Sequence, residues 1–252
     1  MRKLALSTVA LVAALAMTTV AIAQTDGGYT VDGSTSPSKA KGSKKKPVPI
    51  GIDFSLDAPQ GDRPATIAKF HVGFANARTN GAKFKSCTAN SINAAGNDDD
   101  CSKAAKVGSG SVNNLAGATD DQTQKSITCN LEVTLYNGGR NRVAIYVEGN
   151  PNGVPAQCAI PVSQAIDARW VKDGSGVALE FDIPTNLQNP VPGVSNAIQT
   201  LKASFDRKTR GKGSKRVGYI ESIGCKRGKR AIDAELSKAD GSRIVTGANA
   251  RC

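Results

Sequence analysis

The sequence predicts an all-β protein: an antiparallel β-sandwich or open barrel stapled by disulfides, with at most one or two short helical turns. Three observations predict this class. Apolar and polar residues alternate along many short segments, glycine and proline interrupt the chain too often for long helices, and the cysteines number six. Alternation with period two is typical of half-buried strands. Many short strands with regular turns favour a sandwich or barrel.

Three β-hairpins are expected. Their paired segments are 131–135 with 143–147, 168–172 with 177–183, and 230–236 with 243–246. Glycine-containing turns separate the two strands of each pair, which is the usual signal for a hairpin. Helical turns are expected at most in residues 163–168 and 194–203.

The first residues predict export. Arg2 and Lys3 precede an uncharged apolar run that ends in Ala21-Ile22-Ala23, which has small residues where a signal peptidase reads. Residues 1–23 are therefore predicted to be a signal peptide, with the mature chain starting at Gln24. An uncleaved membrane anchor is the alternative, because the run approaches bilayer length. After cleavage no transmembrane segment is expected, and the predicted location is secreted or cell-envelope-associated.

Two regions follow the predicted cleavage point. Residues 24–49 are small, polar and basic, and they are predicted to form a flexible linker that can include a short first strand at 29–31. Residues 50–252 carry steadily recurring apolar positions and are predicted to form a single disulfide-stapled β-domain.

The six cysteines are predicted to form three disulfides. An even number of cysteines in an exported chain is typical of a disulfide framework. Six cysteines allow fifteen pairings, and we favour sequential neighbours because each bond then brackets one loop or hairpin. The predicted pairs are Cys87–Cys101, Cys129–Cys158 and Cys225–Cys252.

The chain is basic. Its formal net charge is +12, and without Arg2 and Lys3 the remaining 31 basic and 21 acidic residues give +10. Outside the cytoplasm, anionic envelope polymers such as teichoic acids, acidic glycans or lipid headgroups are fitting partners for that charge. Another surface protein is a further candidate. A solvated surface without a partner remains the alternative, and nucleic acid is not expected for an exported chain.

Basic residues concentrate in one stretch. Between residues 207 and 230 ten lysines and arginines accompany a single acid, Glu221. The candidate polyanion-binding residues are Arg207, Lys208, Arg210, Lys212, Lys215, Arg216, Lys226, Arg227, Lys229 and Arg230. If the first six form a loop and the last four flank the next turn, they would meet at one end of the sheet and grip phosphate or carboxylate groups.

Catalytic equipment is not recognisable in the sequence. His71 is the single histidine, and it alternates with apolar neighbours as a structural strand residue does. The G-x-S-x-G motif of a nucleophile elbow is absent. Without C-x-x-C pairs or clustered histidines a zinc site is not expected, and no cofactor is expected. Asp98, Asp99 and Asp100 form a calcium candidate, although the spaced D-x-D-x-D-G pattern is missing.

Three stretches resemble a family of exported, uncharacterised β-rich proteins with six cysteines from high-GC soil actinobacteria. They are residues 81–87 with 101–110, residues 162–168, and residues 219–225 running to Cys252. The resemblance implies export and β architecture. It carries over no activity, ligand or catalytic residue, because no function is established for that family.

Three functional hypotheses follow. The first is an exported, non-enzymatic β-domain that associates with anionic cell-envelope polymers through its basic loop. The second is a purely structural spacer domain at the surface. The third is a hydrolase whose carboxylate chemistry the sequence conceals.

Overall fold

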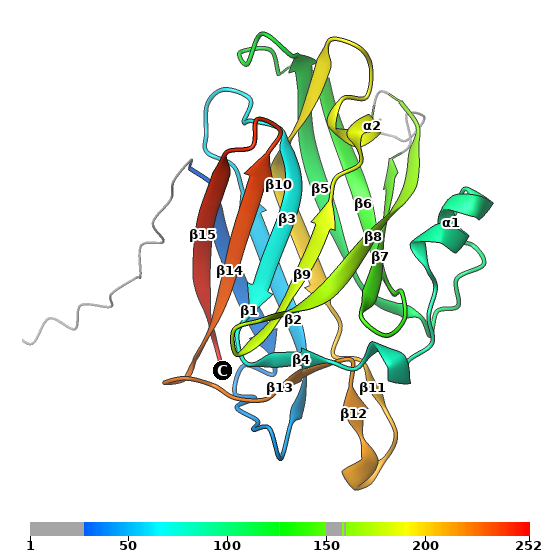
Figure 1. The fold of residues 1–252 in the computed structure, drawn as a ribbon, viewed down its shortest axis with the longest axis vertical. Helices are drawn as coiled ribbons and strands as arrows, with labels where there is room; N and C mark the ends of the chain where they lie inside the picture. The colour runs from blue at the N-terminus through cyan, green and yellow to red at the C-terminus, as the bar shows by residue number, and fades with distance from the viewer. Residues whose placement is uncertain (1–27, 126, 150–157, 159) are drawn as a thin grey trace, which may run out of the picture.

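The computed structural model describes residues 28–125, 127–149, 158 and 160–252. The predicted signal peptide therefore lies outside the described residues. Strands dominate, and the short helices lie in connections between them (Figure 1). The strands are β1 (Thr30–Ser36), β2 (Val48–Asp57), β3 (Ile67–Phe74), β4 (Ala77–Thr79), β5 (Lys106–Ala118), β6 (Ile127–Asn137), β7 (Arg142–Gly149), β8 (Val162–Asp173), β9 (Gly176–Asp182), β10 (Val194–Phe205), β11 (Thr209–Arg210), β12 (Val217–Gly218), β13 (Ile220–Ser222), β14 (Lys229–Lys238) and β15 (Arg243–Arg251).

A single antiparallel sheet forms the body of the molecule. Its order is β15-β14-β3-β9-β8-β7-β6-β5-β10-β2-β13-β4. In addition, β1 pairs with residues 51–57 of β2, beyond the residues 48–50 that pair with β13. The sheet rolls on itself, so that β1 lies beside β15 (Figure 1), where the Thr35 hydroxyl donates to the Arg251 carbonyl at 2.8 Å. The result is an open barrel, as the alternating pattern predicts.

All three predicted hairpins are confirmed as β6–β7, β8–β9 and β14–β15. The two helical alternatives are wrong, because residues 163–168 lie in β8 and residues 194–203 lie in β10. In both segments the alternation of buried and exposed residues is interrupted. In β8, Ile166 and Ala168 are buried on the inner face, and Ala165 is also buried because α1 covers it on the outer face. In β10, a register shift between Ile198 and Thr200 interrupts the pattern.

Short helices occupy the connections, and the longest was not predicted. They are η1 (Gly81–Lys83), α1 (Ala89–Ala95), α2 (Thr185–Gln188) and η2 (Gly213–Lys215). Thr88 and Ser91 form a reciprocal capping box at the start of α1, and Gly96 ends the helix at φ 78°. Ile92 of α1 packs with Tyr136 and Tyr146 in a small second core on the outer face of the sheet.

The first strand is longer than the sequence suggests. Residues 30–36 pair along their whole length with residues 51–57 of β2. Residues 30–36 and 48–49 of the predicted linker are therefore part of the sheet, and the chain from 37 to 47 forms a loop that leads into β2. Ser222 ties this loop down by donating its hydroxyl to the Lys41 carbonyl at 2.7 Å.

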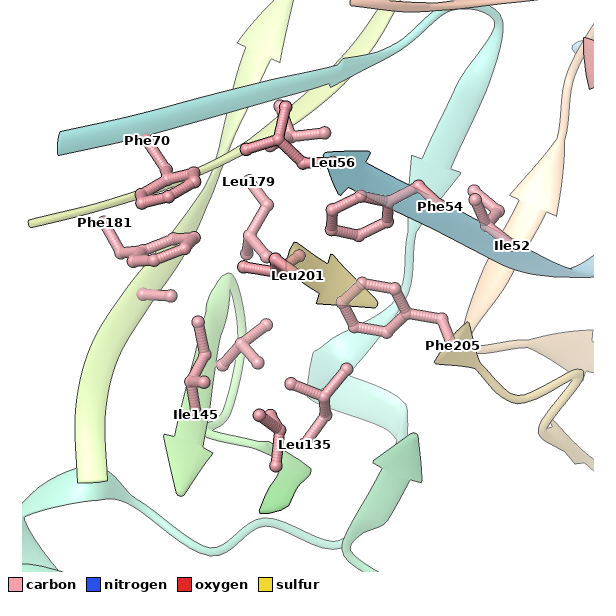
Figure 2. Packing of buried hydrophobic residues seen from close by; sticks show 14 of the residues in the cluster. Ile52, Phe54, Leu56, Phe70, Leu135, Ile145, Leu179, Phe181, Leu201 and Phe205 are labelled. Atoms are coloured by element: carbon pink, nitrogen blue, oxygen red, sulfur yellow. The ribbon is translucent and has the colours of Figure 1, made fainter. Parts of the chain in front are cut away.

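The core fills the interior of the rolled sheet. Figure 2 shows Phe54, Phe70, Phe181, Leu201 and Phe205 converging from opposite walls, as period-two alternation requires. The rings of Phe70 and Phe181 stack with centroids 4.9 Å apart. Burying each such side chain stabilises the fold by about 1.5–3 kcal/mol.

The three predicted disulfide pairs are confirmed. Cys87–Cys101 closes the loop that carries α1, Cys129–Cys158 joins β6 to the chain before β8, and Cys225–Cys252 joins the chain before β14 to the end of β15. Each bond spans 14 to 29 residues of sequence. Three such bonds indicate an oxidising, extracytoplasmic environment.

Candidate functional site

Basic residues gather at one end of the rolled sheet, which lies at the bottom of Figure 1. The strands β11 and β12 form a small two-stranded hairpin there, and the loop before β14 emerges at the same end (Figure 1). Eight of the ten predicted polyanion-binding residues are exposed: Arg207, Arg210, Lys212, Lys215, Arg216, Lys226, Arg227 and Lys229. Both groups lie at the same end of the sheet (Figure 1), and their binding to a polyanion stays a prediction.

The tip of the β11–β12 hairpin presents its charges to solvent. Glycine opens the tip, since Gly211 and Gly213 adopt φ values of 85° and 55° that disfavour other residues. The short helix η2 then carries Lys215, and Arg216 follows it. In the described structure the side chains of Lys212, Lys215 and Arg216 make no hydrogen bond or ion pair. These three groups are therefore available to an anionic ligand.

The base of the hairpin uses its cations to hold the backbone. Arg207 Nε donates to the Pro49 carbonyl at 3.1 Å. Lys208 Nζ donates to the Lys106 carbonyl, and burial lowers the pKa of this amine. Arg210 donates to the Lys83 carbonyl. These side chains fix the direction of the hairpin, and Arg207 and Arg210 still expose part of their surface.

Arg230 does not belong to the binding surface, and its inclusion was wrong. Its side chain is fully buried and donates to the Ala75 carbonyl at 2.6 Å, to the Ser222 hydroxyl and to the Gly224 carbonyl. Burial lowers the pKa of the guanidinium to about 10. Alternation along β14 explains the error, because Arg230 occupies an inward position next to the exposed Lys229.

Glu221, the single acid in the basic stretch, is also buried. Arg78 Nε and Nη2 both reach Glu221 Oε2 at 2.8 Å, and the Asn80 amide donates to the same oxygen at 3.0 Å. The Gly218 N–H donates to Oε1 at 2.9 Å. This carboxylate therefore ties β4, β12 and β13 together and does not neutralise the exposed basic residues.

Five further lysines lie at this end, and sequence reasoning placed them in a linker. Lys39, Lys41, Lys44, Lys45 and Lys46 are all exposed in the 37–47 loop. The loop is attached to the neighbourhood of β13 through the Gly42–Ile223 bridge. In the sequence, the Lys44-Lys45-Lys46 run indicates a concentration of positive charge but not its position. The position follows from the pairing of β1 with β2, which the loop connects. We call residues 39–46, 207–216 and 226–229 together the basic end.

The remaining site candidates are separate from the basic end. His71 lies on the outer face of β3, where Nδ1 is 3.5 Å from Glu180 Oε2 and Nε2 is 3.9 Å from Asp173 Oδ2. Asp98 accepts a hydrogen bond from the Tyr136 hydroxyl at 2.6 Å. Burial, with this bond as a smaller contribution, raises the pKa of Tyr136. The calcium candidate thus has one of its three carboxylates directed toward a tyrosine.

In the described part of the chain no three His, Cys, Asp or Glu side chains gather in a way suited to a metal ion. The longest helix within the described ranges has seven residues, and none of these helices can span a bilayer.

The fold and this surface define a class: a disulfide-stapled, all-β protein with a basic end. Comparisons of the chain with protein-family models, with curated proteins and with solved structures found no match in any of the three.

Proposed function

We propose that this protein is an exported, non-enzymatic β-domain that associates with anionic cell-envelope polymer through its basic end. The observation that carries the proposal is the convergence of three basic segments from distant parts of the sequence. A phosphate-rich polymer, for which teichoic acid is the model, would contact them at the same time. The resemblance to exported actinobacterial proteins supports export and carries no ligand.

The proposed location rests on two features. Residues 1–23 have the pattern of a cleaved signal, and the three disulfides indicate an oxidising compartment. Together these features support secretion or envelope association. Protein recovered from medium or envelope would then have an intact mass that begins at Gln24.

The chemistry of the basic end supports ionic binding. Exposed ammonium groups on flexible stems attract phosphate or carboxylate without fixed geometry, whereas guanidinium groups add two-pronged hydrogen bonds. Exposed charges are screened over about 10 Å at 0.1 M salt. Binding should therefore fall steeply with added salt and show little preference among polyanions.

A salt titration on heparin or teichoic-acid columns tests the proposal. The test variant changes Lys212, Lys215 and Arg216 to Ser, because these side chains hold no other part of the protein. The control variant changes Lys125, Lys202 and Lys238 to Ser, which removes equal charge away from the basic end. We expect the test variant to elute at clearly lower salt than the unaltered protein, and the control variant to elute close to it.

Two results would contradict the proposal. Equal loss of retention in both variants would show that net charge alone controls binding. If the unaltered protein is not retained even at low salt, the spacer hypothesis would stand instead.

A further inference from the structure

The interior of the rolled sheet is incompletely filled. A cavity of about 80 Å³ lies among the core side chains. Phe54, Leu179, Leu201 and Phe205, which Figure 2 labels, line it together with Val133 and other apolar residues. Protein cores are packed so closely that voids larger than a water molecule are few. A second cavity of about 120 Å³ adjoins it toward α2, since Leu131, Leu187 and Asn196 line both.

Two amide side chains face this apolar space. Asn114 is only 3 % exposed, and its Oδ1 has no hydrogen-bond partner among the described residues. Asn196 donates from Nδ2 to the Leu187 carbonyl at 3.0 Å, which leaves its own Oδ1 as a second buried acceptor without a partner. Buried polar groups in proteins are nearly always hydrogen-bonded. Two unpartnered acceptors beside one cavity therefore indicate a donor that enters from outside.

The register places the two amides together. Asn114 lies opposite Ile198 of β10 and opposite Cys129 of β6, on the inward face of β5. Asn196 lies opposite Ala116, two residues further along β5, so the asparagines are diagonal neighbours within reach of one small molecule. Outside these amides, Gln188 and Lys202 are the polar residues of this lining. Lys202 is exposed and alternates with Leu201 and Ala203 along β10, so its charge faces solvent and not the cavity.

The entrance is also apolar. Ile127, Ile160 and Val191 line the adjoining cavity and remain 40, 41 and 45 % exposed. A mainly apolar molecule would meet matching side chains on its way in, whereas a charged one would lose its hydration without an opposite charge to meet.

We propose that the interior of the rolled sheet is a binding site for a small, mainly apolar molecule that carries one hydroxyl or N–H donor. The apolar walls hold the body of the ligand, and Asn114 and Asn196 accept its hydrogen bond. Apolar cavities of about 150 Å³ are known to take up benzene-sized molecules, so the two adjoining cavities fit a substituted phenol.

Calorimetric titration with p-cresol and p-xylene tests this site. The two molecules have nearly the same shape, and only p-cresol has a donor. We expect the unaltered protein to bind p-cresol about tenfold or more tightly than p-xylene, as one net hydrogen bond predicts. Asn114→Leu should reduce that preference to less than about threefold.

Two further variants show whether the effect comes from the amide and the cavity. Asn113→Leu makes the same change on the exposed face of the same strand and should leave the tenfold preference intact. Ala203→Leu, which fills the cavity wall, should weaken both ligands, with circular dichroism confirming that each variant is folded. Equal binding of p-cresol and p-xylene by the unaltered protein would overturn the proposal, because the cavity would be only an apolar void. Failure of both to bind would also overturn it and leave ordered water as the partner of the amides.

Discussion

At the basic end Trp170, Phe205 and Tyr219 pack ring against ring, whereas at the opposite end Ile127 and Val191 remain 40 and 45 % exposed. Trp170 Nε1 also donates to the Tyr219 hydroxyl at 3.2 Å. The basic end is thus closed by aromatic packing and buried hydrogen bonds, and the end beside α2 (the α2 end) is closed loosely by aliphatic side chains.

The same fold therefore carries a basic, tightly packed end and an apolar, loosely packed end. Exposed lysines repel one another, so a backbone that gathers them must be held by other contacts. Glu221 and Arg230 supply such contacts within the basic end. The α2 end also holds a buried cation, Arg63, which donates to the Ala118 carbonyl at 2.6 Å, but the cavities beside it leave room inside the sheet.

Removing either of two disulfides should destabilise the fold, but only the one at the basic end should also affect binding to heparin. Cys225–Cys252 lies at the basic end and spans 27 residues, and Cys129–Cys158 lies at the α2 end and spans 29. Because the loops are nearly equal, replacing either pair with Ser should lower the free energy of unfolding by about 3.5 kcal/mol in urea titrations. Only loss of Cys225–Cys252 should also weaken retention on heparin, since it releases the loop that carries Lys226. Weakened retention in both variants would contradict the distinction between the ends.

Arg230→Met should show that a buried cation stabilises the basic end. Its loss leaves the carbonyls of Ala75 and Gly224 without this donor, and we expect the free energy of unfolding to fall by about 3 kcal/mol. Lys229→Met, on the exposed face of the same strand, should change it by less than about 0.5 kcal/mol. Comparable effects of the two changes in urea titrations would show that Arg230 is not a structural contact.

Tyr219 should make the aromatic packing sensitive to alkali. Burial raises the pKa of this phenol from 10.0 to about 12. A folded-state pKa above the unfolded value means that the neutral phenol stabilises the fold below pH 10, and that this stability is lost as the pH rises toward 12. Tyr219→Phe should therefore flatten the decline in unfolding free energy over that interval. At pH 7 it should cost about 1 kcal/mol, because Trp170 Nε1 loses its acceptor. An unchanged alkaline slope would contradict the buried state of Tyr219.

The sequence was informative wherever one face of a strand is buried and the other is solvated. The β6–β7 hairpin and the three disulfide pairs follow from local spacing, and both are confirmed. In β8, the burial of Ala165 under α1 interrupts the alternation, and the capping box of α1 is a short signal within a polar loop.

The site was partly predictable for a related reason. Charge density identifies the β11–β12 hairpin, but it cannot distinguish Lys229, which faces solvent, from the buried Arg230 beside it. The lysines of the 37–47 loop reach the basic end through strand pairings between distant residues. The interior amides Asn114 and Asn196 look like ordinary polar strand residues until the register shows which way they face.

Chemical-shift mapping with a short linear polyphosphate tests the central claim most directly. The unaltered protein would be titrated at low salt while the backbone amide resonances are followed. We predict shifts concentrated in residues 39–46, 207–216 and 226–229, reversed by added salt, with little change around Ile127, α2 and Val191. Shifts centred on the α2 end, or spread evenly over the surface, would contradict the assignment of polyanion binding to the basic end.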